Sequence, residues 1–176
     1  MPRPSAREQI LDAYREILIE HGPVAVTLEA VAARAEVSKG GLLYHFGSKD
    51  ALLDGLLERV RTLHAEDVEL ARKAPDGPVR YYLRTSISDA KPDNPAFRTL
   101  LAVIRMSSIE PKVSATLREC TEDWHALIAE SVTDPLTAEL ITLVGDGLYL
   151  RAAIDDGRTE PAADLDFDEV LRRLKG

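Results

Sequence analysis

With 176 residues, the chain is long enough for one domain with a substantial core, or for a small module joined to a larger one. Its composition, 45% hydrophobic and 30% charged, is that of a folded globular protein and excludes an intrinsically disordered one. The formal net charge of −8 argues against a protein that is basic all over, but the first fifty residues are close to neutral and most of the negative charge follows them. A basic patch at the N-terminal end is therefore compatible with the overall charge.

Signals of several other protein classes are missing from the sequence. Cys120 is the single cysteine, which excludes a disulfide within the chain and a cysteine-based zinc site. The first residues lack the apolar stretch of a signal peptide, and no apolar run approaches the length of a membrane span. We therefore expect a cytoplasmic protein with no membrane partner.

The N-terminal part reads as four helices. Ser5 and Glu8 have capping-box spacing and open a helix that the Gly22-Pro23 pair ends. Three further residues can act as helix N-caps, and an amphipathic helical pattern follows each of them: Thr27, Ser38 and Ser48. The third of these four helices is expected to run from Ser38 to about Phe46.

Longer helices follow a Pro-Asp-Gly-Pro turn at residues 75–78. Three prolines stand where the first turn of a helix tolerates them, and helical periodicity follows each: Pro95, Pro111 and Pro135. A short helix at 167–174 closes the pattern, and no strand or hairpin signal occurs. We predict an all-α fold of about nine helices, with an N-terminal three-helix module and a C-terminal helical bundle.

The stretch EVSKGGLLYHFGSKDALL, residues 36–53, carries the functional signal. Two short helices joined by a turn of three or four residues have the spacing of a helix-turn-helix, whose second helix enters the DNA major groove. Glycine inside a helix lowers helix stability by about 1 kcal/mol relative to alanine. The presence of Gly40 and Gly41 is explained if bases or phosphates must approach the helix backbone closely. Lys39 and Lys49 supply cations near exposed N–H groups, which attract phosphate.

Residues 5–57 resemble the DNA-binding domain of the TetR family of bacterial transcriptional regulators. The match runs from the first helix through VTLEAVAARAEVSKGGLLYHFGSKDALLDGLL. Two positions depart from the family pattern: Leu43 stands where many members have tyrosine, and Gly47 where lysine or proline is more usual. The resemblance implies that Thr27 caps the second helix and touches a phosphate. It assigns the remaining DNA contacts to the third helix and the start of the fourth: Ser38, Lys39, Gly40, Gly41, Tyr44, His45 and Lys49.

The resemblance also divides the chain. Residues 1–50, continuing into the fourth helix to about 57, form the DNA-binding domain, and residues 51–176 form a domain for dimerisation and effector binding. The last two long helices, about 112–132 and 136–156, are expected to form the homodimer. The candidate interface residues lie on the second of them: Leu143, Gly145, Gly147 and Leu148. Two glycines inside a helix are equally well explained by tight packing within one subunit.

A small-molecule effector is implied by the resemblance, and its pocket should combine apolar residues with a few polar groups. The candidates with this character are Tyr81, Tyr82, Phe97, Arg105, Met106, Trp124, His125 and Tyr149. An aromatic residue in such a pattern is more often part of an ordinary core than of a pocket.

These observations predict a ligand-responsive regulator that acts as a homodimer on a palindromic DNA operator. Repression is expected rather than activation, because the resemblance is to a family whose members are mostly repressors. The alternative is a helical adaptor that keeps the helix-turn-helix but binds protein. An enzyme is not expected, since the sequence has no His-Glu-x-x-His, Gly-x-Ser-x-Gly or phosphate-loop motif, and no cofactor or metal ion is predicted.

Overall fold

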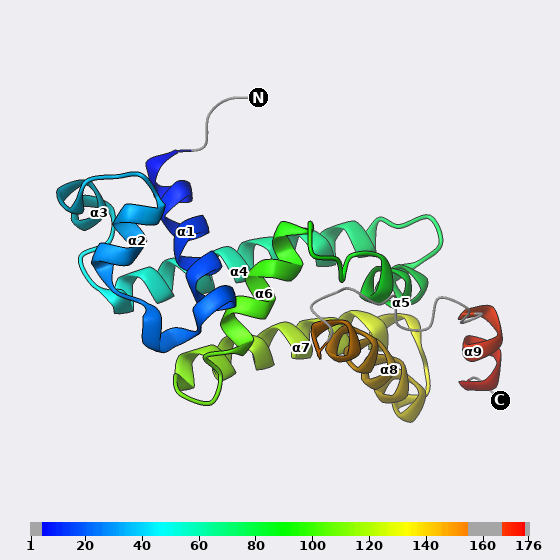
Figure 1. Cartoon of the computed structure of the whole chain (residues 1–176). Coiled ribbons are helices and arrows are strands. Elements are labelled where there is room, and N and C mark those ends of the chain that lie inside the picture. The colour runs from blue at the N-terminus through cyan, green and yellow to red at the C-terminus, as the bar shows by residue number, and fades with distance from the viewer. Residues whose placement is uncertain (1–4, 155–166, 175–176) are drawn as a thin grey trace. The chain divides into compact units, whose positions relative to one another are not determined.

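A computed structural model describes residues 5–154 and 167–174 of the chain (Figure 1). The elements in chain order are α1 (Ala6–His21), η1 (Pro23–Ala25), α2 (Leu28–Arg34), α3 (Lys39–His45), α4 (Lys49–Arg72), α5 (Pro78–Ser88), α6 (Pro95–Ile104), α7 (Pro111–Ser131), α8 (Pro135–Ile154) and α9 (Phe167–Leu174). These ranges contain no strand, so the predicted all-α fold is confirmed. Within the same ranges, no helix combines the length and the apolar character needed to cross a bilayer.

Most helices begin where the sequence places a cap or a proline. The Ser5 and Thr27 hydroxyls accept hydrogen bonds from the backbone N–H groups of Glu8 and Ala30, at 3.3 and 3.0 Å. Helices α6, α7 and α8 each start at a proline, which has no N–H to leave unpaired in the first turn. The short 3-10 helix η1 between α1 and α2 was not predicted.

The end of α2 is fixed by its backbone. Glu36 has a positive φ of 55°, and the N–H groups of Glu36 and Val37 donate to the carbonyls of Ala33 and Ala32 at 3.2 and 3.0 Å. This pair of bonds is a Schellman motif, which usually has glycine at the left-handed position. The chain therefore turns sharply after α2, and α3 starts only a few residues later.

The chain divides into two compact units. The first comprises the described residues of Met1–Thr62 and Arg98–Thr116, and the second those of Leu63–Phe97 and Leu117–Gly176. In the first unit α1 packs against α2 and α3 around fully buried side chains: Ile10, Leu11, Leu18, Val31, Leu42, Leu52 and Leu56.

The segment 98–116 is attached to the rest of the first unit by polar contacts. The Arg98 guanidinium binds the Glu16 carboxylate on α1, and the Tyr14 hydroxyl donates to the Met106 sulfur at 3.4 Å. Lys112 donates to the carboxylate of Asp54, at 2.6 Å, and to that of Asp50. These contacts join distant parts of the sequence within one unit.

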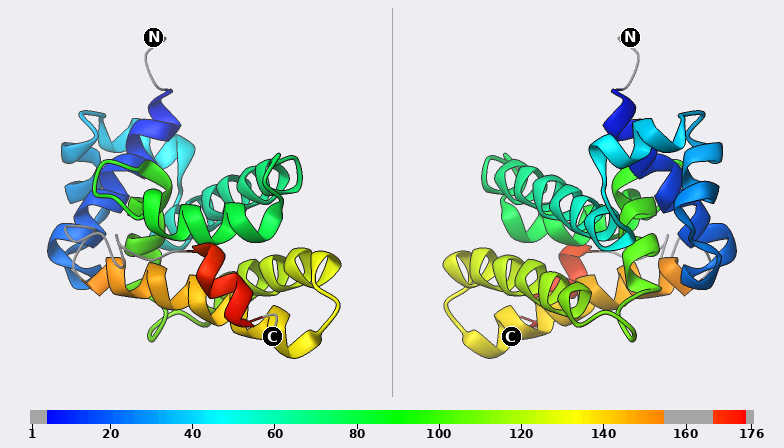
Figure 2. Two further views of the ribbon diagram at one scale, coloured as in Figure 1. Left: turned by 90° about the vertical axis from the view of Figure 1, so that its right-hand side faces the viewer. Right: turned by 90° about the vertical axis from the view of Figure 1, so that its left-hand side faces the viewer.

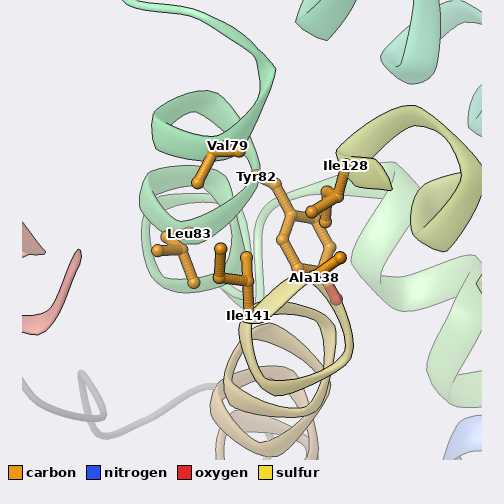
Figure 3. Close-up of a cluster of buried hydrophobic side chains, with 6 residues drawn as sticks. All are labelled: Val79, Tyr82, Leu83, Ile128, Ala138 and Ile141. Atoms are coloured by element: carbon orange, nitrogen blue, oxygen red, sulfur yellow. The ribbon is translucent and has the colours of Figure 1, made fainter. Parts of the chain in front are cut away.

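The second unit is built around the packing of α5 on α8, and α9 lies against both (Figure 2). Its core brings together α5, α7 and α8 through Val79, Tyr82, Leu83, Ile128, Ala138 and Ile141 (Figure 3). Trp124, Val132 and Val144 cover this cluster from its edge.

Candidate nucleic-acid interface

One face of helix α3 packs against the core of the first unit, and the opposite face is exposed to solvent. Leu42 and Phe46, one turn apart, are buried. The Ser38 hydroxyl caps the helix by accepting a hydrogen bond from the Gly41 N–H at 3.0 Å. Because the cap and the two apolar residues fix the helix, the side chains between them face solvent.

All the residues that the sequence assigned to DNA lie at the surface of the first unit. Gly41 is partly exposed and the other seven are exposed: Thr27, Ser38, Lys39, Gly40, Tyr44, His45 and Lys49. Tyr44 has 85% of its surface accessible, and its ring meets that of His45 edge to face at 5.1 Å. Leu43, which was not assigned to DNA, is also exposed on α3.

The surroundings of Gly40 are open, and those of Gly41 are partly occupied by the cap of the helix. Among the described residues, a Cβ atom added at Gly40 would come no closer than 4.0 Å to a neighbour, the Ser38 hydroxyl. At Gly41 a Cβ atom would lie 3.2 Å from the same hydroxyl and 4.0 Å from Val37. Packing among the described residues therefore does not explain Gly40, whereas a side chain at Gly41 would press against the helix cap.

Gly55 on α4 is the opposite case, and sequence reasoning did not single it out. A Cβ atom there would lie 2.7 Å from the Phe46 ring and 3.2 Å from Leu11. The absence of a side chain at Gly55 lets α4 approach the ring that anchors α3. A sequence pattern does not reveal this role, because Leu11 and Phe46 are far from Gly55 along the chain.

Lys39 has a partner on the preceding helix. Its Nζ donates to Glu29 Oε1 at 2.6 Å. This hydrogen bond lowers the pKa of Glu29, and the charges of Lys39 and Lys49 act in the same direction. The Arg7 guanidinium, on α1, lies over the Phe46 ring and pairs with Glu58.

Six of the eight candidate effector residues belong to the second unit: Tyr81, Tyr82, Phe97, Trp124, His125 and Tyr149. The rings of Tyr82 and Trp124 are 4.8 Å apart, and those of Phe97 and Tyr149 are 5.4 Å apart. The Tyr81 hydroxyl donates to the half-buried Asp67 carboxylate at 2.6 Å. Desolvation raises the pKa of Asp67, a residue that sequence reasoning did not select.

The remaining candidates are placed elsewhere. Arg105 and Met106 belong to the first unit, where Arg105 is exposed and Met106 is buried against the Tyr14 hydroxyl. His125 is half-buried, and its Nε2 lies 3.2 Å from the Glu139 carboxylate. The structure therefore groups the aromatic candidates but does not place all eight in one unit.

The four candidate dimer residues on α8 point in different directions. Gly145 is buried, and a Cβ atom there would overlap the Tyr82 ring, with the hydroxyl oxygen only 2.7 Å away. Leu148 is also buried. Leu143 is 55% exposed, and Gly147 has no other atom within 4 Å of its Cβ position. The close approach at Gly145 is therefore to Tyr82 of the same chain.

An apolar stripe on α8 was not recognised in the sequence. Its exposed members are Leu136, Leu140, Leu143, Leu150 and Ile154. They recur every three or four residues when Gly147 is included, which is the spacing of a helix–helix seam. The same spacing occurs in buried helices, so only the exposure of these side chains in the structure distinguishes the stripe from core.

Comparison with known proteins gives matches over nearly the whole chain. Residues 10–56 match the family model of bacterial regulatory proteins of the tetR family, and residues 76–175 match that of the tetracyclin repressor-like C-terminal domain. The HTH-type transcriptional regulator BetI of Burkholderia mallei is 30% identical over 169 residues, which cover 88% of this chain and 87% of that protein. BetI of Burkholderia cenocepacia is 28% identical over 180 residues, 94% of this chain and 93% of the relative.

Solved structures with the same fold include a TetR-family member from Streptomyces coelicolor A3. It has a TM-score of 0.75 and 26% identity, and the alignment covers 97% of this chain and 98% of the other. The multidrug binding protein EbrR in complex with malachite green has a TM-score of 0.70 and 25% identity, with the same coverage.

Proposed function

The chain belongs to the TetR family of DNA-binding transcriptional regulators, and we propose that it is a ligand-responsive repressor that binds a palindromic operator as a homodimer. In this proposal it has no catalytic activity, since its relatives are transcriptional regulators. It acts in the cytoplasm, where its DNA is found.

The observation that carries the DNA-binding role is the open backbone at the start of α3. Among the described residues, a Cβ atom at Gly40 would meet only the cap of its own helix, at 4.0 Å, so the cost of this glycine in helix stability has no compensation there. A DNA backbone or base edge that approaches α3 would supply it. Lys39 and Lys49, both exposed, stand on either side of this opening in the sequence.

In the operator complex, we assign different tasks to the two ends of this surface. Thr27, Ser38 and Lys49 lie at helix N-termini, where free N–H groups favour phosphate. Tyr44 and His45 extend from the exposed side of α3 and contact bases or backbone. Lys39 can reach guanine O6 and N7, a contact worth about 1–3 kcal/mol of discrimination.

The exposed stripe on α8 supports the homodimer. It offers Leu136, Leu140, Leu143 and Leu150 with Gly147 between them, and glycine lets two helices approach closely. The interface proposed here keeps Leu143 and Gly147 from the sequence prediction and omits Gly145 and Leu148, which face the interior. Two recognition helices would then meet successive major grooves, about 34–36 Å apart.

The homodimer is tested by light scattering on the full chain. The wild type is expected to be a dimer at micromolar concentration, and Leu143→Glu is expected to be a monomer because a charge in an apolar seam is left unpaired. Leu70→Glu is the control, since Leu70 is an equally exposed leucine on α4 of the same unit. A monomeric wild type would remove the basis of the palindromic operator.

Effector binding is proposed for the second unit, where most aromatic candidates lie. A ligand there would change DNA affinity only through its preference for the conformation that does not bind DNA. A thermal-shift screen tests this, because a ligand of the native state raises the unfolding temperature. The expected result is a stabilising compound that also releases the protein from DNA.

The main experiment is selection of duplex DNA from a random pool by the full chain. The expected product is an inverted repeat whose half-sites lie about one helical turn apart. Replacing Lys39 and Lys49 by alanine should abolish the selection, whereas Lys73→Ala, an exposed lysine at the end of α4, should not. Failure to enrich any sequence would favour the protein-binding adaptor.

A further inference from the structure

Glu29 places a carboxylate within the proposed DNA-binding surface. Glu29 lies in the first turn of α2. Its Oε1 accepts a hydrogen bond at 2.6 Å from the Nζ of Lys39, which is the first residue of α3. Both side chains are largely exposed, 65% for Glu29 and 60% for Lys39. The pair is therefore accessible to any other charged group that approaches α3.

The hydrogen bond between Lys39 and Glu29 also has an electrostatic effect. It lowers the pKa of Glu29 more than any other contribution, and the charge of Lys49 acts weakly in the same direction. Glu29 thus pairs directly with Lys39, one of the two lysines that the proposed function assigns to DNA. A DNA phosphate would offer the Lys39 ammonium group an anionic oxygen of the same kind.

The ion pair between Glu29 and Lys39 contributes little to the stability of the fold. Exposed ion pairs typically contribute about 0–1 kcal/mol, and a carboxylate in the first turn of a helix is favourable whether or not a lysine is near. Helix α2 already has its cap in Thr27, and α3 in Ser38. Loss of the Glu29 charge should therefore leave the fold intact.

We propose that Glu29 is an internal competitor of DNA phosphate for Lys39, and that it limits the affinity of the protein for DNA of arbitrary sequence. The proposal rests on the DNA-binding role of α3. To bind a phosphate, Lys39 must leave Glu29, and the released carboxylate then attracts a cation from solution. Both effects oppose binding, and both involve charge alone.

This competition matters most for non-specific DNA. Binding to arbitrary sequence is almost entirely electrostatic, whereas an operator complex also gains contacts to bases. The genome offers a large excess of non-operator sites, so a regulator benefits from weak binding to them. Glu29 would act as a specificity-determining residue without contacting a base.

Glu29→Gln in the full chain tests the inference on a duplex of arbitrary sequence, with fluorescence anisotropy across a range of salt concentrations. The affinity is expected to rise about two- to five-fold, the effect of one exposed ion pair. The dependence of log K on log salt should steepen by about 0.9, since one more phosphate contact releases one more counterion.

The matched control is Glu20→Gln, which removes the same charge and breaks a comparable exposed pair, that with Arg34. It should change non-specific affinity clearly less than Glu29→Gln. In a background with Lys39→Ala and Lys49→Ala, the gain from Glu29→Gln should fall to the size of this control. Thermal unfolding should be unchanged in both single variants.

Three results would overturn the inference: an affinity that does not rise, a rise equal to the control, or a rise that persists in full without the two lysines. The last two would mean that Glu29 repels DNA only through the net charge of the protein. If the wild type binds no duplex at all, the proposed function fails together with the inference. If the wild type binds duplex and Glu29→Gln binds no better, only the inference fails.

Discussion

Helices α3 and α8 each contain glycines, which are unfavourable inside a helix. The space around Gly40 on α3 differs from the space around Gly145 on α8. At Gly40 the space is open apart from the cap of the same helix. At Gly145 the space is filled by the ring of Tyr82, which α5 supplies. One glycine therefore keeps a surface free, and the other admits a neighbour from within the chain.

The comparison shows that a glycine inside a helix indicates the close approach of a neighbour. It does not reveal whether that neighbour belongs to the same chain or to a partner such as DNA. In the sequence, the Gly40-Gly41 pair and the Gly145/Gly147 pair invite the same explanation. The structure separates them: among the described residues only Ser38 comes within 4 Å of a Cβ atom at Gly40, whereas the Tyr82 ring fills the space at Gly145. Substitutions at both sites can therefore distinguish a glycine that serves binding from one that serves folding.

The largest expected effect is on folding, from Gly145→Ala. The new methyl group would overlap the Tyr82 ring. That ring cannot move easily, because its single hydroxyl proton is shared between two acceptors, Asp146 Oδ1 at 2.9 Å and Thr142 O at 3.1 Å. Overpacking of this kind costs about 1–3 kcal/mol. We expect the free energy of unfolding, measured with denaturant, to fall by about 2 kcal/mol.

Gly147→Ala is the control for this substitution, and both variants are compared in the Leu143→Glu background, where the proposed dimer interface does not contribute to stability. A Cβ atom at Gly147 would meet no atom within 4 Å, so alanine should not lower the stability of the subunit, and its better helix propensity favours a gain. Equal losses at both positions would show that Tyr82 has no special relation to Gly145.

The next largest effect is on binding, from Gly40→Ala. A methyl group at the start of α3 would hold the backbone away from DNA, and we expect affinity for the selected operator to fall about tenfold, or 1.4 kcal/mol. Thermal stability should stay the same or rise, because the site is open and alanine favours the helix by up to about 1 kcal/mol. Unchanged operator affinity would contradict the role assigned to this glycine.

Much of the fold could be predicted because its signals are local. The starts of α6, α7 and α8 follow from Pro95, Pro111 and Pro135, and the caps of α2 and α3 follow from Thr27 and Ser38. Each of these signals involves residues within one turn of a helix. The surface of α3 could be predicted for the same reason, since Leu42 and Phe46 determine which side is buried.

The features that escaped prediction depend on residues far apart in the sequence. Gly145 meets Tyr82, Gly55 meets Phe46 and Leu11, and Glu29 meets Lys39 across the turn between two helices. Nothing in the composition of either partner marks these pairs, because the pairing is decided by how helices pack. The stripe on α8 escaped for a related reason: periodicity indicates a helix face but does not say what covers it.

A third, smaller effect is expected where the backbone needs a glycine and the sequence has none. Glu36 adopts a φ of 55° at the end of α2, a conformation that costs a residue with a side chain about 1–2 kcal/mol. Glu36→Gly should relieve this cost, although the more flexible unfolded chain offsets part of the gain. We expect an increase in unfolding free energy of about 0.5–1 kcal/mol. A loss of stability would mean that the Glu36 side chain itself is needed in the turn.

The smallest effect concerns the interior of the second unit and depends on pH. Desolvation raises the pKa of Asp67, so in wild type its contribution to stability is complete below the pKa of an unfolded aspartate, about 3.9, and is lost as the pH rises through the folded value. Asparagine carries no charge and can still accept the hydrogen bond from Tyr81. Asp67→Asn should therefore be more stable than wild type at neutral pH, and this difference should disappear as the pH falls below about 4. Denaturant unfolding at several pH values measures it, with the exposed neighbour Glu66→Gln as control. A difference that does not change with pH would mean that hydrogen bonding or packing, and not the buried charge, determines the effect of Asp67 on stability.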